Sequence, residues 1–332
     1  MAADVQRGLT SRHIIRVLSR AIVTLLMVAC LNFILFRVIP GDPANMLLEG
    51  ARVSVAPGQI DAQRQRWGLD RPLFPDQVVD YLSATLHGDL GYSFKFRGRH
   101  VADLILERLP ATIALVGLAQ FIAVVCGVML GLYAGWRRGG AVDHIATGVS
   151  LALYSTPSFW LGMILVVIFS TGLGWFPGYG AYSPGGTSGS VDWLLDYLLH
   201  LALPVTAVAL GLIGQYVVVA RAAMSEVVTE DYMVTARAKG LTNSQMLMRH
   251  AFRNAMLPVI TLITLNLGYV VAGAITVEAV FAWPGIGGLT VEALNARDYP
   301  VLQGIFLLLG ASIVVANLVA DLAYGLLDPR VR

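Results

Sequence analysis

The nucleophilic, basic and metal-ligating side chains of this sequence do not fall into a spacing typical of a catalytic site. The sequence has no His-Glu-x-x-His motif of a zinc protease. The run Gly148-Val149-Ser150-Leu151-Ala152 only approaches a nucleophile elbow, and the histidines are scattered over positions 13, 87, 100, 144, 200 and 250. No Gly-Lys pair occurs, so the sequence lacks a phosphate-binding P-loop. Any ATP that powers this protein must bind to another chain.

Two acidic residues near the ends of apolar runs are the remaining candidates for chemistry, in this case proton or ion coupling. Ion-driven transport favours paired ionisable groups near the middle of the membrane. Glu278 lies near the end of one apolar run, and Asp321 lies near the end of another. Their positions favour an interfacial or structural role and leave an ion-coupled secondary transporter as a distant alternative.

The composition indicates that these residues are carried by membrane-spanning helices. Of the 332 residues, 56% are hydrophobic and 13% are charged, whereas about a quarter of the residues of a soluble domain are charged. Because about 20 apolar residues cross a bilayer, we expect an all-α integral membrane protein with six transmembrane helices. The six apolar runs are Ala21 to Val38, Ala111 to Trp136, Ile145 to about Gly174, Leu201 to Ala220, Ala255 to about Val277, and Val301 to Ala320.

The basic residues of the loops predict the orientation of these helices. Segments 1–20, 137–144, 221–255 and 328–332 hold 13 of the 23 Lys and Arg residues, and segments 172–200 and 281–300 hold only Arg297. Because short cytoplasmic loops are enriched in Lys and Arg, we expect both termini in the cytoplasm and the first run as a retained anchor. The expected parts are a cytoplasmic N-terminus (1–20), helix 1 (21–39), an extracytoplasmic lobe (40–110), a core of helices 2–6 (111–328) with a cytoplasmic segment (221–256), and a cytoplasmic tail (329–332).

Two patterns predict how the helices pack. Gly127, Gly131 and Gly135 recur every four residues in the second run, which is typical of a face that another helix approaches closely. Just before that run, apolar residues at helical spacing predict an amphipathic stretch that ends the outer lobe. Its shared face comprises Val101, Leu104, Ile105 and Leu109.

Polar residues interrupt several of the apolar runs. Pro157 follows three polar residues in the third run, and we expect a kink there because proline removes a backbone donor. The neighbouring hydroxyls either satisfy the carbonyls that the kink frees or face a polar path. Gln215 and Asn266 are lone polar residues, for which interhelical hydrogen bonding is the ordinary explanation. The candidates for lining a path are Tyr154, Ser155, Pro157, Ser158, Gln215 and Asn266.

The segment between the fourth and fifth runs is charged and helix-prone. Glu230 and Asp231 begin a run that Arg237 and Lys239 close, and Gly240 then supplies the stop, where we expect a tight turn with positive φ. A second short helix is expected to lead into the fifth run. Taken alone, this pattern favours an ordinary charged helix on the membrane surface.

The same segment resembles the signature of permease subunits of ATP-binding-cassette importers, which has Glu-Ala-Ala, three residues, Gly and an Ile-x-Leu-Pro ending. The sequence keeps Ala236, Gly240 and Leu257-Pro258, but it has Val234 and Thr235 at the Glu and first Ala positions. The spacing from Gly240 to Pro258 resembles the dipeptide, oligopeptide and nickel branch of this family. Further matches are Pro40-Gly41-Asp42-Pro43, Gly88-Asp89-Leu90-Gly91, Arg108-Leu109-Pro110-Ala111-Thr112, Arg249-His250-Ala251-Phe252-Arg253-Asn254-Ala255, Phe281-Ala282-Trp283-Pro284-Gly285, Arg297-Asp298-Tyr299-Pro300 and Leu327-Asp328-Pro329-Arg330.

The resemblance runs from about residue 14 to the C-terminus, and the large lobe is similar to that of the first, "B-type", dipeptide permease. It implies a non-enzymatic subunit of a bacterial cell-membrane importer that forms a path for dipeptides or short peptides, with nickel, glutathione or another small solute as the alternative. The implied partners are a second, non-identical permease, two ATPase domains that bind ATP and Mg²⁺, an extracytoplasmic substrate-binding protein and membrane lipid, and no nucleic acid. No cofactor is implied in this chain. The residues implied to couple to the ATPase are Asp231, Tyr232, Thr235, Ala236, Arg237, Ala238, Lys239 and Gly240, with Ala236 and Ala238 as small residues on the docked face.

Overall fold

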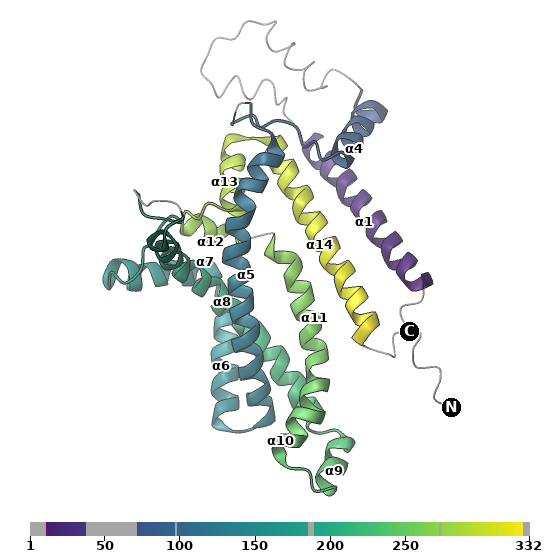
Figure 1. Ribbon diagram of the computed structural model, residues 1–332, viewed down its shortest axis with the longest axis vertical. Helices are drawn as coiled ribbons and strands as arrows, with labels where there is room; N and C mark the ends of the chain where they lie inside the picture. Colours follow the sequence, from purple (N-terminus) through teal and green to yellow (C-terminus); the bar gives the residue numbers. More distant parts are fainter. Residues whose placement is uncertain (1–10, 38–71, 97, 185–188, 272–273, 328–332) are drawn as a thin grey trace, which may run out of the picture. The chain divides into compact units, whose positions relative to one another are not determined.

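The computed structural model describes residues 11–37, 72–96, 98–184, 189–271 and 274–327, and within them the regular structure is helical apart from one β-bridge between Tyr92 and His100. Five helices are long and apolar enough to cross a membrane, and one bent pair of helices can supply a sixth span. The chain is therefore an all-α, multi-pass membrane protein. Its helices, shown in Figure 1, are α1 (Ser11–Arg37), η1 (Leu73–Gln77), α4 (Val78–Leu86), α5 (Val101–Trp136), α6 (Ala141–Ser155), α7 (Ser158–Leu165), η2 (Val166–Gly172), α8 (Val191–Val227), α9 (Asp231–Ala238), α10 (Asn243–Met246), η3 (Leu247–Ala251), α11 (Phe252–Val270), α12 (Ile275–Val280), α13 (Ile286–Ala296) and α14 (Tyr299–Leu327).

The chain divides into two compact units. The first comprises residues 1–108, 289–318 and 324–332, and the second comprises residues 109–288 and 319–323. The expected lobe at 40–110 falls mostly in the first unit, and its part from 40 to 71 lies outside the described residues, as does the expected tail at 329–332.

In the first unit, α1 packs against α4 and α14 (Figure 1). The Asn32 side-chain amide donates to the backbone carbonyl of Gln303 at 2.9 Å, and the rings of Phe33 and Tyr81 lie 5.4 Å apart. Gly310 leaves the room that Val28 occupies, because a Cβ at this glycine would lie 2.4 Å from a Val28 methyl group. The first apolar run is thus a helix that specific contacts at Val28, Asn32 and Phe33 hold to the rest of the unit.

A buried carboxylate organises the loop that precedes α5 in the same unit. Asp298 has no exposed surface, and its oxygens accept hydrogen bonds from the Ser93 hydroxyl and from the backbone N–H groups of Phe94 and Lys95, both at 3.0 Å. The Lys95 ammonium also pairs with Glu292 at 3.2 Å. Because a carboxylate that accepts several hydrogen bonds replaces its lost hydration, Asp298 fixes this loop against the turn between α13 and α14.

In the second unit, α5 and α8 approach so closely that only glycine fits along the contact. A Cβ on Gly131 would lie 2.6 Å from the Val217 carbonyl oxygen and 2.8 Å from the Ala220 Cβ. Gly127 and Gly135 meet α8 one turn away on either side in the same manner. The packing face predicted from the four-residue glycine spacing is confirmed.

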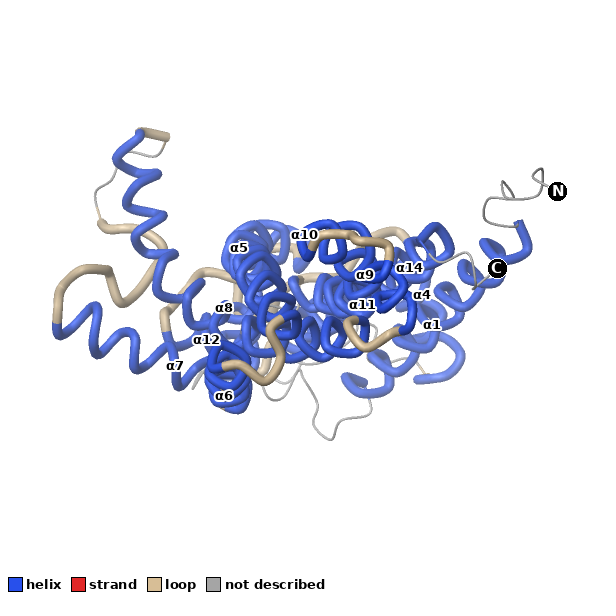
Figure 2. Tube along the Cα trace, turned by 90° about the horizontal axis from the view of Figure 1, so that it is seen from below, coloured by secondary structure: helices blue, strands red, loops and turns tan. Residues whose placement is uncertain are grey.

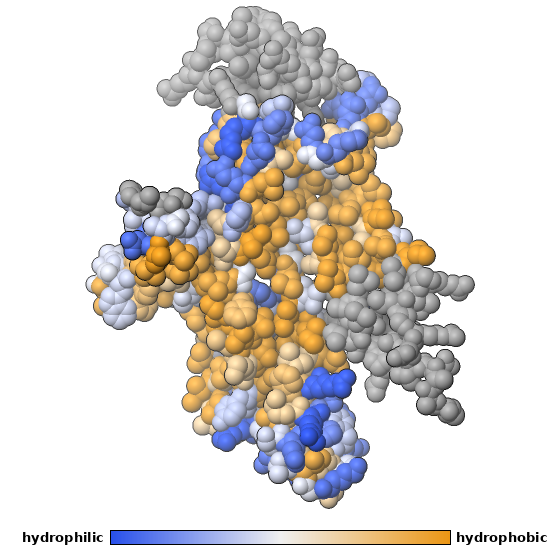
Figure 3. Space-filling view, viewed as in Figure 1, coloured by the Kyte–Doolittle hydropathy of each residue, from blue (hydrophilic) through white to orange (hydrophobic). Residues whose placement is uncertain are grey.

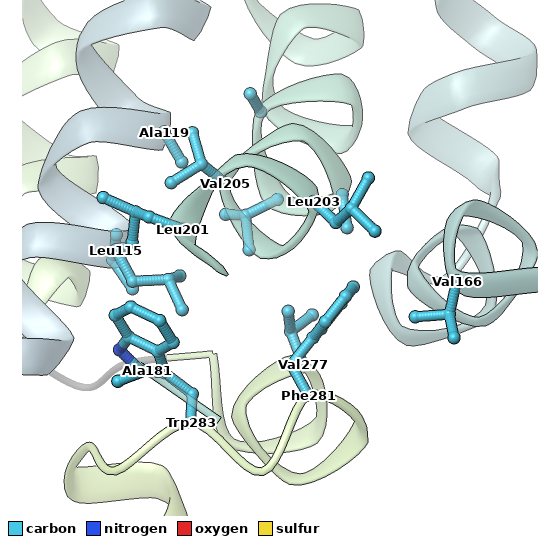
Figure 4. Packing of buried hydrophobic residues seen from close by; sticks show 14 of the residues in the cluster. Leu115, Ala119, Val166, Ala181, Leu201, Leu203, Val205, Val277, Phe281 and Trp283 are labelled. Atoms are coloured by element: carbon cyan, nitrogen blue, oxygen red, sulfur yellow. The ribbon is translucent and has the colours of Figure 1, made fainter. Parts of the chain in front are cut away.

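The larger hydrophobic core of this unit gathers side chains from α5, η2, α8, α11 and α12, together with Trp283 from the turn after α12 (Figure 4). Trp283 is 1% exposed, and its indole N–H donates to the Ala111 carbonyl at 2.9 Å. Phe281 is equally buried and lies over Gly162 of α7, where a Cβ would come within 2.9 Å of its ring. The turn at 281–285 is therefore part of the core.

Several helices extend beyond the predicted apolar runs. The helix that contains the second run begins at Val101, because the amphipathic stretch with buried Val101, Leu104 and Ile105 continues through the exposed Pro110. The helix that contains the fourth run begins at Val191, ten residues before that run. The predicted fifth run is divided, since α11 ends at Val270 and Val277 belongs to the separate helix α12.

Candidate functional site

The segment between α8 and α11 forms two short helices, as the sequence predicts. Glu230 is the extended residue before α9. Thr242 caps the start of α10: its hydroxyl accepts from the Gln245 N–H, and the Gln245 side chain accepts from the Thr242 N–H. Gly240 ends α9 with φ at +78°, a conformation that favours glycine. The predicted tight turn with positive φ is confirmed.

One face of α9 anchors the helix to the second unit. Met233 and Ala236 are each 5% exposed and belong to a buried cluster with Met246, Ala251 and Ala255. The prediction that Ala236 lies on an outward, docked face is therefore wrong. Its small side chain serves instead to bring α9 close to its own chain, because α10 and the start of α11 fold back beneath it.

The opposite face of α9 is free within the described chain. Asp231, Val234, Thr235 and Ala238 follow the spacing i, i+3, i+4, i+7, so they form a single stripe, and all four are exposed. Arg237, Lys239 and Gly240 are also exposed. In Figure 3 the surface over α9 and α10 is largely hydrophilic, and it lies at one end of the apolar helices.

Tyr232 fixes the rotation of α9. Its hydroxyl accepts a hydrogen bond from the Asn254 side chain at 2.9 Å, and the same amide nitrogen donates to the His250 carbonyl at 3.1 Å. This bond and the burial of Met233 and Ala236 fix the orientation of α9 on the second unit, and with it the direction in which the exposed stripe faces. The coupling role of the predicted residues 231–240 stays a prediction.

The predicted kink at Pro157 is confirmed, and it is large. Helices α6 and α7 meet at an angle of 98°, and Figure 2 shows α6 nearly end-on with α7 leaving it sideways. The Thr156 hydroxyl donates to the Ala152 carbonyl at 2.7 Å, so this polar residue stabilises the end of α6 at the kink. Tyr154 and Ser155 are exposed, and Ser158 is partly buried beside Gly211 of α8. Whether Tyr154, Ser155, Pro157 and Ser158 line a path stays a prediction.

Gln215 and Asn266 come together in a polar cluster between α5, α8 and α11. The Asn266 side-chain nitrogen donates to the Gln215 carbonyl oxygen at 3.2 Å and to the Tyr216 hydroxyl at 3.0 Å. Gln120 of α5 completes the cluster by donating to the same hydroxyl. Interhelical hydrogen bonding of Gln215 and Asn266 is confirmed. Gln120 and Tyr216 were missed, although Gln120 is also a lone polar residue in an apolar run.

Glu278 has a structural role, as its position favoured. It lies on α12, has no exposed surface, and accepts from the Thr112 hydroxyl at 2.9 Å and from the Gly288 N–H at 3.1 Å. The Thr112 oxygen in turn accepts from the Ile286 N–H at 2.7 Å. Among the described residues, no group of three His, Cys, Asp or Glu side chains is placed to hold a metal ion.

Comparisons with known proteins agree with one another along the chain. Residues 127–332 match the family described as binding-protein-dependent transport system inner membrane component, and residues 10–116 match the N-terminal region of such membrane components. The chain is 40% identical over 336 residues to the di/tripeptide transport system permease protein DppB of Pseudomonas aeruginosa. This alignment covers 96% of this chain and 98% of that protein. It is 38% identical over 343 residues to the dipeptide transport system permease protein DppB of Escherichia coli K12, covering 97% and 98% of the two chains. A putative peptide permease protein of Brucella suis is 38% identical over 311 residues, covering 93% and 95%.

Proposed function

We infer the function of this chain from its family: it belongs to the inner membrane components of binding-protein-dependent transport systems, and it is a permease of the peptide branch of ATP-binding-cassette importers. It is a transport subunit and not an enzyme. Such an importer works with a partner permease, an ATPase and a binding protein. The chain thus supplies part of the membrane path for dipeptides or short peptides.

The finer assignment of partners and location is part of the proposal. The second permease is a non-identical chain, two ATPase domains act from the cytoplasm, and the binding protein delivers peptide from the other side. The chain lies in the bacterial inner membrane with both termini in the cytoplasm, which the distribution of basic loop residues supports. ATP and Mg²⁺ bind to the ATPase subunits, and this chain holds no cofactor.

The exposed stripe of α9 is the observation that carries the proposed coupling mechanism. Its four residues are available to a partner, while Met233 and Ala236 bury the other face in the chain's own core. Among the four, Ala238 has a side chain small enough to lie deep in a groove. ATP binding draws the two ATPase domains together, they displace α9, and the balance between two arrangements of the spans shifts.

The test is Ala238→Glu in the complete importer, reconstituted in proteoliposomes with its binding protein. A charge buried without a partner in the ATPase groove costs on the order of several kcal/mol, so peptide uptake and peptide-stimulated ATP hydrolysis should both be lost. The amount of the variant in the membrane should stay normal, because Ala238 contributes nothing to the folded core.

The matched control is Ser244→Glu, which adds the same charge at an exposed position of α10 outside the stripe. It should transport at the rate of the unchanged protein. Normal uptake and ATP hydrolysis by Ala238→Glu would show that the stripe does not contact the ATPase, and the coupling role would have to be sought elsewhere.

A further inference from the structure

The polar cluster between α5, α8 and α11 is built around buried members. Tyr216 has no exposed surface and Gln120 is 4% exposed, whereas Gln215 and Asn266 are only partly buried. Tyr216 and Gln120 lie near the middle of their long helices, and Asn266 lies near the end of α11. The cluster therefore has a closed side, toward α5, and an accessible side that the two amides form.

The hydrogen bonds determine which atoms of the two amides face the accessible side. The Asn266 nitrogen is engaged by two acceptors, the Gln215 carbonyl oxygen and the Tyr216 hydroxyl. Within the described chain, the Asn266 carbonyl oxygen and the Gln215 side-chain nitrogen have no hydrogen-bond partner of their own. Two adjacent side chains thus present one acceptor and one donor.

This pair matches the polar atoms of a peptide group, which carries one N–H donor and one C=O acceptor. On the closed side, the Gln120 side-chain nitrogen donates to the Tyr216 hydroxyl. A polar atom without a partner at membrane depth is costly, and it is tolerated where it lines a cavity or binds something. In Figure 3 a small polar patch is visible between α5 and α11, surrounded by apolar side chains.

We propose that Gln215 and Asn266 form a binding site for a peptide group of the transported substrate. The Gln215 side-chain nitrogen donates to the substrate carbonyl, and the Asn266 carbonyl oxygen accepts from the substrate N–H. Tyr216 and Gln120 are positioning residues that hold the Asn266 amide in the required orientation. The proposal rests on the proposed function, peptide transport, and adds to it the part of the peptide that this chain recognises. Because every dipeptide has this group, the site binds independently of the substrate side chains.

The experiment compares L-alanyl-L-alanine with alanyl-L-lactate, an ester that lacks the N–H and has a weaker carbonyl acceptor. Uptake is measured with the complete importer in proteoliposomes, with each ligand at a concentration that saturates the binding protein and with the loaded binding protein limiting. A hydrogen bond that is lost or weakened typically changes affinity by about 3- to 10-fold. The unchanged protein should therefore import the dipeptide about 3 to 10 times faster than the ester.

The variants Asn266→Leu and Gln215→Met remove the acceptor and the donor while keeping side chains of similar size. In each, the ratio of dipeptide to ester uptake should fall toward 1, mainly through slower dipeptide uptake. The control is Thr261→Val on α11, since the Thr261 hydroxyl donates only to its own helix, to the Leu257 carbonyl at 3.1 Å. It should keep the ratio of the unchanged protein.

A ratio near 1 in the unchanged protein overturns the site, whatever the variants do. So does an undiminished ratio in Asn266→Leu or in Gln215→Met, and one folded variant is enough to decide. Failure of the unchanged importer to take up any dipeptide would instead contradict the proposed function, so the two failures are distinguishable.

Discussion

Gly131→Ala should destabilise the protein even though alanine is the better helix former. The substitution gains up to about 1 kcal/mol of helix propensity. However, the new Cβ would lie 2.6 Å from the Val217 carbonyl oxygen, 2.8 Å from the Ala220 Cβ and 3.0 Å from the Val217 Cα. Two of these three atoms belong to the α8 backbone, so no side-chain rotation relieves the contact and α5 must move away from α8. Overpacking of this kind costs about 1–3 kcal/mol, and contact with backbone places it at the upper end, which leaves a net loss of about 1–2 kcal/mol.

The matched control is Gly148→Ala in α6, where a Cβ would meet nothing within 4 Å. There the propensity gain stands alone, so stability should rise by up to about 1 kcal/mol. The free energy of unfolding is measured by reversible denaturant titration of the purified protein in mixed micelles, followed by circular dichroism. The two variants should differ by about 2–3 kcal/mol, with opposite signs relative to the unchanged protein. A Gly131→Ala protein as stable as the Gly148→Ala protein would refute the close contact of α5 and α8.

Three further changes test other parts of the structure. Ala236→Leu should cost about 1–3 kcal/mol of stability in the same titration, whereas Ala238→Leu should change it by less than about 0.5 kcal/mol, and equal effects would contradict the anchoring of α9 through Ala236. Thr112→Val should cost about 1–3 kcal/mol because it removes the buried hydroxyl that donates to Glu278 and accepts from the Ile286 N–H, and Thr206→Val, whose hydroxyl donates to its own helix, should cost little. After replacement of Cys30 and Cys126, Tyr179→Cys should react with an impermeant thiol reagent from outside intact cells and Ser244→Cys should not; the reverse pattern would contradict the proposed orientation.

Features that depend on a short stretch of backbone could be predicted from the sequence. The glycine spacing of α5 predicted the close contact with α8, since only small residues permit it. Gly240 predicted a positive φ because it follows a short helical run, and Pro157 predicted an interruption because proline lacks a donor. The size of the bend at Pro157 was not predictable, because it depends on what α7 packs against, including Phe281.

Features that depend on residues far apart in the chain could not be predicted. One hydrogen-bond donor to Glu278 is Thr112, 166 positions earlier, and no local pattern joins them. Ala236 was assigned to the wrong face because the burial of an eight-residue helix depends on where α10 and α11 return beneath it. Gln215 and Asn266 could be identified in the sequence as lone polar residues in apolar runs. The orientation of their amides could not be predicted, because it depends on hydrogen bonds that involve Tyr216 and Gln120.

The buried cluster under α9 also includes residues of α5, α8, α10 and α11, among them Tyr216. A close-packed interior has low compressibility and transmits strain, so a load applied at α9 is shared by three spans and does not bend one of them alone. The same rigid block carries, through Tyr216, the amides of Gln215 and Asn266. If a partner displaced α9, as proposed, packed side chains would therefore connect that displacement to the polar cluster through Tyr216.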